Sequence, residues 1–270
     1  MSLPAPPPLA RLLAGCYIAA AMTDAPPMPD PAESAAGVSP AERRRRARIE
    51  RWSRPLVTPR QRFHAWISML IGDNGIVRLV YPNRHQFADG VWRSGQPTPG
   101  QLRAFARRGG RSVVSLRAGR GFGSLPLELE ACHEAGMTYH NLVIRARALP
   151  TRDELRAAAN LFQTIERPVL FHCMSGADRS GFASALFLML AEGRPVAEAR
   201  RQLSLRYGHN RFGKAGVLDA FFDAYRRDTK RSPMTLTEWI ETRYDPGEIT
   251  AEYSATPIGT RIGNYLRRDK

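Results

Sequence analysis

The sequence predicts an α/β protein in which helices flank a mainly parallel sheet. From residue 91 onward, short apolar runs alternate with segments of helical periodicity, the pattern of strands joined by covering helices. Hydrophobic residues make up 43% of the 270-residue chain, which is enough for a sizeable core. We expect one such domain over residues 75–228, with a C-terminal helix and tail over residues 229–270.

The N-terminal stretch, residues 1–39, is rich in Pro and Ala and is predicted to be a flexible tail, because it can bury too little surface to offset ordering. Residues 13–16 resemble a lipoprotein cleavage box. Only four apolar residues separate Arg11 from Cys16, however, and a signal peptide needs an apolar segment of about 7 to 15. An export signal is therefore not expected, and Met22 and Met28 are alternative translation starts.

Residues 40–74 are predicted to form two helices. Ser39, followed by Pro40 and then Glu42, gives a capping box that begins an arginine-rich, mostly solvated helix. A second helix spans residues 61–71 with one apolar face, formed by Phe63, Trp66, Ile67 and Leu70. We expect this face to dock on the protein's own domain, and a membrane surface is the alternative.

The remaining elements follow in order. A helix begins at Thr98 and reaches about residue 108, residues 112–116 form a strand, residues 125–135 form a helix, and residues 137–144 are extended. A capped helix runs over residues 151–166, and Pro168 separates it from a buried strand at residues 169–171. Further helices are expected at residues 182–191, 195–206, 215–227 and 235–243, and the pattern beyond residue 245 is unclear.

The loop at residues 172–181 joins the buried strand to a helix. Such a loop points backbone N–H groups inward at the positive end of a helix dipole, which makes a cradle for an anion such as phosphate. We expect its residues to bind the phosphate of the substrate: His172, Met174, Ser175, Gly176, Ala177 and Gly181.

Three residues of this loop carry reactive chemistry. Cys173 is predicted to be an acidic thiol and the nucleophile, because the helix N-terminus and Arg179 both favour the thiolate. The Arg179 guanidinium can hold two phosphate oxygens at once. Ser180 can donate a hydrogen bond to the sulfur and ease its departure. The alternative interpretation is an inert buried cysteine near a surface arginine.

The whole segment resembles the signature loop of the protein tyrosine and dual-specificity phosphatase superfamily, H-C-x-x-G-x-x-R-[ST]-G, and every specified position matches. Residues 91–97 and the strand at 113–117 also resemble the opening of bacterial members, so the likeness covers roughly residues 75–228. It implies a sheet-and-helix sandwich and a two-step reaction through phosphocysteine, with no metal or other cofactor.

The resemblance also implies a general acid, usually an Asp on a separate loop before the cysteine. Residues 139–144 contain no carboxylate. Asp178 is favoured as the acid because it resembles the Asp before Arg in a bacterial subgroup that acts on phosphoproteins and phosphoinositides. Asp153 is the alternative, although helix capping already explains its position. His140 is a further possible donor.

A departure from the family pattern concerns lipid substrates. Several lipid-directed relatives carry Lys where this chain has Ala177, so that cation is missing from the loop. Arg145 and Arg147, which follow the preceding extended segment, are predicted either to replace it at the pocket rim or to lie on a solvated loop.

Composition and charge bear on partners and location. The net charge of +15 favours anionic partners. We expect a phosphorylated protein as the substrate, with a phosphoinositide or another phospholipid, or an inositol phosphate, as the alternative, and an inactive phosphate-binding module as a second alternative. Nucleic acid is not expected, since no basic motif interleaved with aromatics is present. Three cysteines and apolar runs of at most ten residues predict a cytoplasmic protein, with peripheral contact to anionic membranes through the basic segment.

Overall fold

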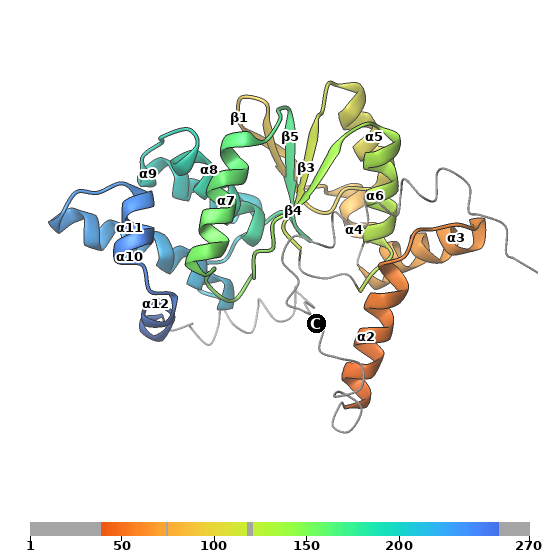
Figure 1. Cartoon of the computed structure of the whole chain (residues 1–270), viewed down its shortest axis with the longest axis horizontal. Helices are drawn as coiled ribbons and strands as arrows, with labels where there is room; N and C mark the ends of the chain where they lie inside the picture. The colour runs from red at the N-terminus through yellow and green to blue at the C-terminus, as the bar shows by residue number, and fades with distance from the viewer. Residues whose placement is uncertain (1–38, 74, 118–120, 254–270) are drawn as a thin grey trace, which may run out of the picture. The chain divides into compact units, whose positions relative to one another are not determined.

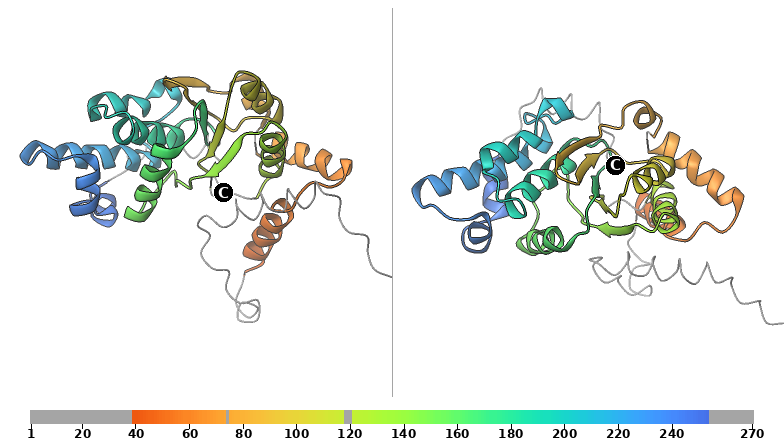
Figure 2. Two further views of the ribbon diagram at one scale, coloured as in Figure 1. Left: turned by 45° about the horizontal axis from the view of Figure 1, so that its top comes forward. Right: turned by 90° about the horizontal axis from the view of Figure 1, so that it is seen from above.

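The structure, a computed structural model, describes residues 39–73, 75–117 and 121–253 (Figure 1, Figure 2). The predictions for the N-terminal tail, its cleavage-like box and the end of the C-terminal tail lie outside these residues. The chain divides into two compact units. The first unit comprises Met1–Tyr81, Pro97–Val113 and Gly119–Asn141, and the second comprises Pro82–Gln96, Val114–Ala118 and Leu142–Lys270. The domain boundaries drawn from the sequence stay a prediction.

Five strands form one sheet in the order β1-β2-β5-β3-β4. The strands are β1 (His85–Ala88), β2 (Val91–Ser94), β3 (Ser112–Ser115), β4 (Thr138–Asn141) and β5 (Val169–His172). Strands β2 and β5 run parallel, with Val91 opposite Val169 and Ser94 opposite His172. The predicted α/β class with a mainly parallel sheet is confirmed. The antiparallel hairpin of β1 and β2 is an addition that the sequence pattern did not predict.

The first unit is built mainly from helices. They are α2 (Pro40–Trp52), α3 (Pro59–Ile67), the π-helical turn η1 (Ser68–Gly72), α4 (Gly75–Val80), α5 (Pro99–Arg107) and α6 (Ser124–Glu134). The Ser39 side chain caps α2 by accepting from the Glu42 amide at 3.2 Å, as expected. Thr58 and Thr98 form full capping boxes at the starts of α3 and α5.

The apolar face predicted for α3 is only partly covered. Trp66 and Leu70 pack on a small cluster that includes Trp52 and Met69, as expected. Phe63 and Ile67 instead remain 62% and 41% exposed. The helix is rotated so that Ala65 and Met69 face inward. The prediction that the whole face docks on the protein is therefore wrong for Phe63 and Ile67.

The second unit contains β1, β2 and β5 together with the C-terminal helices. These are α7 (Arg152–Thr164), α8 (Asp178–Leu190), α9 (Val196–Ala199), α10 (Val217–Arg231), α11 (Leu236–Thr242) and α12 (Pro246–Glu252). Helix α8 begins at Asp178, four residues earlier than predicted. The predicted helix over residues 195–206 is wrong, because α9 gives way to short 3₁₀ turns that end at Gly208, where φ is +79°. Helix α12, capped by Asp245, was not predicted.

The core of the second unit holds the strand and helix on either side of the predicted phosphate loop. Helix α8 is apolar around most of its circumference and is correspondingly buried, and it packs against β5 and β2. Phe187 of α8 makes edge-to-face contacts with Phe162 and Phe171, at centroid distances of 5.3 and 5.7 Å. Phe182 packs in the same way on Phe221. The loop between β5 and α8 is therefore fixed at both of its ends.

Candidate active site

Cys173 lies directly after β5, the central strand of the sheet. The strand ends at His172, whose carbonyl accepts from the Leu116 amide at 2.9 Å on one side. On the other side His172 pairs with Ser94 at the end of β2. In parallel sheets, ligands bind beyond the carboxyl ends of the strands. The loop therefore stands where the fold provides a ligand site.

The Arg93 side chain, fully buried under the loop, organises the loop backbone. Its Nη2 donates to the carbonyl oxygens of Gly176 and Ala177 at 2.8 and 2.9 Å. Its Nη1 donates to the Gln202 backbone and side-chain oxygens at 2.7 and 2.9 Å. The guanidinium therefore holds two neighbouring carbonyls of the loop in fixed positions. The Gly176 N–H donates to the Cys173 sulfur at 3.3 Å.

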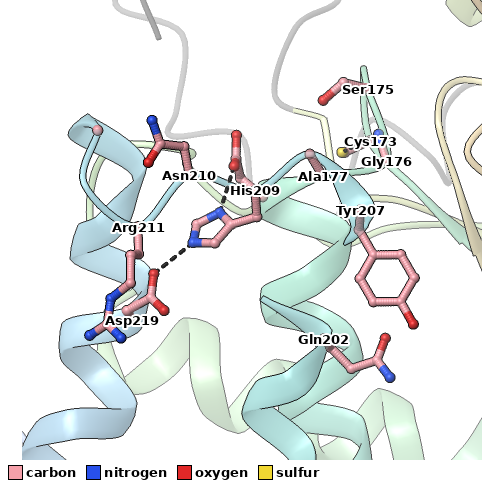
Figure 3. A network of polar contacts seen from close by, with 12 residues as sticks. Cys173, Ser175, Gly176, Ala177, Gln202, Tyr207, His209, Asn210, Arg211 and Asp219 are labelled. Atoms are coloured by element: carbon pink, nitrogen blue, oxygen red, sulfur yellow. Dashed lines mark hydrogen bonds and ion pairs between the residues drawn. The ribbon is translucent and has the colours of Figure 1, made fainter. Parts of the chain in front are cut away.

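Asn83 and Tyr207 add a second set of supports. The Asn83 Nδ2 donates to the Ser175 carbonyl at 3.0 Å and to the Tyr207 carbonyl at 2.9 Å. The Arg93 guanidinium lies 4.3 Å from the centre of the Tyr207 ring, a cation–π contact. Figure 3 shows Tyr207 and Gln202 below the loop. Sequence reasoning missed this support, and its signal was a charged residue, Arg93, directly after the apolar Val91 and Trp92 in a short strand.

Burial and neighbouring charges also act on Arg93 itself. Burial, the largest effect, lowers the pKa of the Arg93 guanidinium to about 10, while the charges of Cys173, Tyr207 and Asp178 act in the opposite direction. The guanidinium therefore stays protonated at neutral pH and keeps its donors for the loop carbonyls.

The surroundings of the Cys173 thiol act on its pKa in opposite directions. Burial, the largest single effect, raises the pKa of this thiol. The positive charge of Arg179 and hydrogen bonds from Ser180 outweigh burial, so the net pKa of Cys173 is lowered. The Ser180 hydroxyl also lies 3.2 Å from the Ser94 carbonyl oxygen. The predicted direction of the shift agrees with this arrangement.

Gly176 is required by the backbone of the loop. Its φ is +75°, in the left-handed region that side chains disfavour. A Cβ at this position would also lie 2.6 Å from the Gly95 nitrogen and 2.8 Å from the Ser94 carbonyl carbon. The tight approach of the loop to the end of β2 therefore depends on this glycine.

A buried histidine that sequence reasoning missed lies beside the loop, between two carboxylates (Figure 3). The His209 Nδ1 lies 2.7 Å from the Asp178 Oδ1, and its Nε2 lies 2.6 Å from the Asp219 Oδ2. Burial, the largest effect, lowers the pKa of His209, but the two carboxylates outweigh it and the net pKa is raised. Nothing in the sequence signalled this contact, because His209 and Asp219 lie on separate elements.

The other predicted residues lie in varied surroundings. Arg145 is exposed and pairs with Glu154 at 2.8 Å, and Arg147 is exposed as well. Asp153 is also exposed, at the first turn of α7, where it pairs with Arg156 at 2.6 Å. The roles of Arg145 and Arg147 at a pocket rim stay predictions. Asp178, unlike Asp153, is buried, and it belongs to the loop itself.

Part of the chain is similar to a known protein family. Residues 122–197 match the model of the tyrosine phosphatase family. A search of curated proteins found no match. Similar solved structures include Tk-PTP in its active form, with 23% identity, 47% of this chain and 85% of that chain covered, and a TM-score of 0.40.

Two further structures resemble the chain at a similar level. P. aeruginosa TpbA in complex with pTyr shares 18% identity, with 56% of this chain and 92% of that chain covered and a TM-score of 0.43. Human DUSP28 shares 14% identity, with 55% of this chain and 96% of that chain covered and a TM-score of 0.41. With TM-scores below 0.5, these chains say nothing about the substrate of this one.

The matched segment contains β5, the loop and α8, so the family match and the site coincide. This match supports the class that the sequence predicted, a cysteine-dependent phosphatase.

Proposed function

We propose that this chain removes phosphate from phosphorylated protein side chains, with phosphotyrosine preferred, through a phosphocysteine formed on Cys173. The observation that carries the proposal is the position of the Cys173 sulfur at the end of β5, where it accepts from the Gly176 N–H at 3.3 Å, inside a segment that matches the tyrosine phosphatase family. The phospholipid alternative is not favoured by that match.

The reaction proposed for the loop has two steps. In the first, the Cys173 sulfur attacks phosphorus, the ester P–O bond breaks, and the leaving oxygen takes a proton. In the second, water attacks the phosphocysteine, and the S–P bond breaks to return the thiolate and release inorganic phosphate. Arg179 and the loop N–H groups stabilise the phosphate oxygens throughout. Ser180, which helps lower the pKa of the sulfur, eases its departure in the second step.

The proton for the leaving oxygen is proposed to come from Asp178, with His209 as its reservoir. A doubly protonated His209 ring donates to a carboxylate at each nitrogen. Transfer of the Nδ1 proton makes Asp178 a carboxylic acid, which protonates the leaving oxygen. Asp219 holds the ring in place through its contact with Nε2. In the second step, the attacking water gives a proton to Asp178, which passes it back to the His209 Nδ1.

The variant His209→Gln is expected to lower kcat about tenfold or more for leaving groups of high pKa, such as phenyl phosphate. The effect on p-nitrophenyl phosphate should be small, because that leaving group needs little protonation. The raised pKa of His209 keeps its proton in place above the ordinary value of about 6.5. As pH rises through the raised pKa, kcat for phenyl phosphate should fall, and this basic limb should be missing in the variant.

The matched control is His133→Gln, on α6 in the other unit. This variant should leave kcat unchanged for both phenyl phosphate and p-nitrophenyl phosphate. Asp178→Asn should show the same dependence on leaving group as His209→Gln. An equal loss on both phosphates in His209→Gln would mean that the histidine is merely structural.

The substrate class is tested by phosphate release from a phosphotyrosine peptide, matched phosphoserine and phosphothreonine peptides, and phosphoinositide vesicles. We expect the highest kcat/KM on the phosphotyrosine peptide. A higher value on the vesicles would establish the lipid alternative instead. Absence of turnover on every substrate, with inorganic phosphate still bound, would leave the inactive binding module.

A further inference from the structure

Helix α4 turns its charged residue inward and its apolar residues outward. Arg78 is 6% exposed and donates to the Asp73 backbone oxygen and, at 3.1 Å, to the Asp73 Oδ2. The Ser124 hydroxyl donates to the same carboxylate oxygen at 3.0 Å. This buried ion pair is costly to break and fixes the rotation of the helix.

The outward side of α4 is apolar over its whole width. The exposed side chains on α4 and directly after it are Ile76, Val77, Leu79, Val80 and Tyr81. Val80, the last residue of α4, is 86% exposed. In the described part of the chain, nine of the eleven exposed large apolar residues lie between Val57 and Tyr81. A concentration of this kind marks an interaction surface.

The segment before this face is strongly basic. Residues 40–62 contain nine arginines and two glutamates, and both glutamates are already paired, Glu42 with Arg45 and Arg46 and Glu50 with Arg54. A pocket of about 560 Å³ lies at the junction of α2 and α3. Its lining includes Arg51, Arg54, Arg60 and His64. Arginine forks suit phosphate oxygens.

We propose that residues 40–81, here called the N-terminal surface, dock on a bilayer that contains anionic phospholipid. The arginines of α2 and of the pocket bind the lipid phosphates, and the apolar face of α4 enters the boundary between head groups and acyl chains. A second copy of the chain is a poorer occupant, because two such basic segments would repel each other. No helix in the described ranges is long and apolar enough to cross a bilayer, so the contact is peripheral.

Flotation of the intact chain with vesicles tests this proposal. We expect the chain to bind vesicles of phosphatidylcholine mixed with phosphatidylglycerol. This binding should weaken at high salt. Val77→Asp combined with Val80→Asp should weaken it about tenfold or more, since both apolar contacts are lost. Arg51→Gln combined with Arg60→Gln should have a similar effect at low salt. Leu205→Asp, at a side chain 80% exposed in the other unit, is the matched control and should bind normally.

Hydrolysis of a water-soluble substrate tests the proposed phosphatase activity separately from the proposed membrane binding. Both double variants should hydrolyse p-nitrophenyl phosphate like the parent chain, and circular dichroism should show an intact fold. Equal binding to purely neutral vesicles, or binding that neither double variant weakens, would overturn the proposal. It would also be overturned if light scattering showed an oligomer that the valine variant dissociates, because the face would then be an interface between copies.

Discussion

Cys173→Ser is expected to abolish turnover of p-nitrophenyl phosphate, with a loss on the order of 10⁵-fold or more, as for other enzymes that lose their nucleophile. A serine hydroxyl is far less acidic than the Cys173 thiol, whose pKa is lowered. Arg179 and Ser180 cannot stabilise the alkoxide enough to ionise a serine at neutral pH. The variant should still bind inorganic phosphate, because the loop N–H groups and Arg179 remain. Steady-state release of nitrophenolate measures the first effect and calorimetry the second.

Cys132→Ser provides the matched control. Cys132 is the other free cysteine in the described part of the chain and is equally buried, but burial and the charge of Glu128 raise its pKa. This variant should keep turnover. Of these two cysteines, Cys173 should therefore react faster with iodoacetamide, and its alkylation rate should fall only at a pH below the ordinary pKa of a thiol. Turnover by Cys173→Ser at the same rate as the parent chain would exclude the phosphocysteine route.

Arg93→Lys should lower kcat/KM by about 10²-fold or more, although Arg93 is assigned no contact with substrate. One ammonium cannot reproduce the fork that holds the carbonyls of Gly176 and Ala177 together with Gln202. A small displacement of the loop then misaligns its N–H groups with the phosphate oxygens. The thermal midpoint should also fall, since buried carbonyls lose donors.

The control for this variant is Arg103→Lys, at an exposed arginine that pairs with Glu134 at 2.7 Å. It should change neither kcat/KM nor the thermal midpoint, because an exposed pair contributes little. A phosphate-binding measurement separates the two effects in Arg93→Lys: binding should weaken together with turnover. Full turnover and binding in Arg93→Lys would mean that the loop keeps its shape without the buried fork.

The sequence by itself determined most of the elements that hold the loop, and it predicted the chemistry of the loop. The run from His172 to Gly181 predicts an anion cradle from local features alone, because an apolar strand, glycines and a helix start are enough to build one. The capping boxes at Thr98 and Thr151 likewise fixed the starts of two helices, because a cap depends on residues three positions apart. These features are local, so a single sequence reveals them.

Only the tertiary structure decided what surrounds the loop. Arg93 meets Gly176 from a strand far away in the sequence, and His209 joins Asp178 and Asp219 across two elements. No periodicity predicts such contacts, because they depend on how strands and helices pack. The same reason explains α3 and α4: the pattern identified apolar side chains, but the rotation set by Ala65, Met69 and the Asp73–Arg78 pair decided which of them face water.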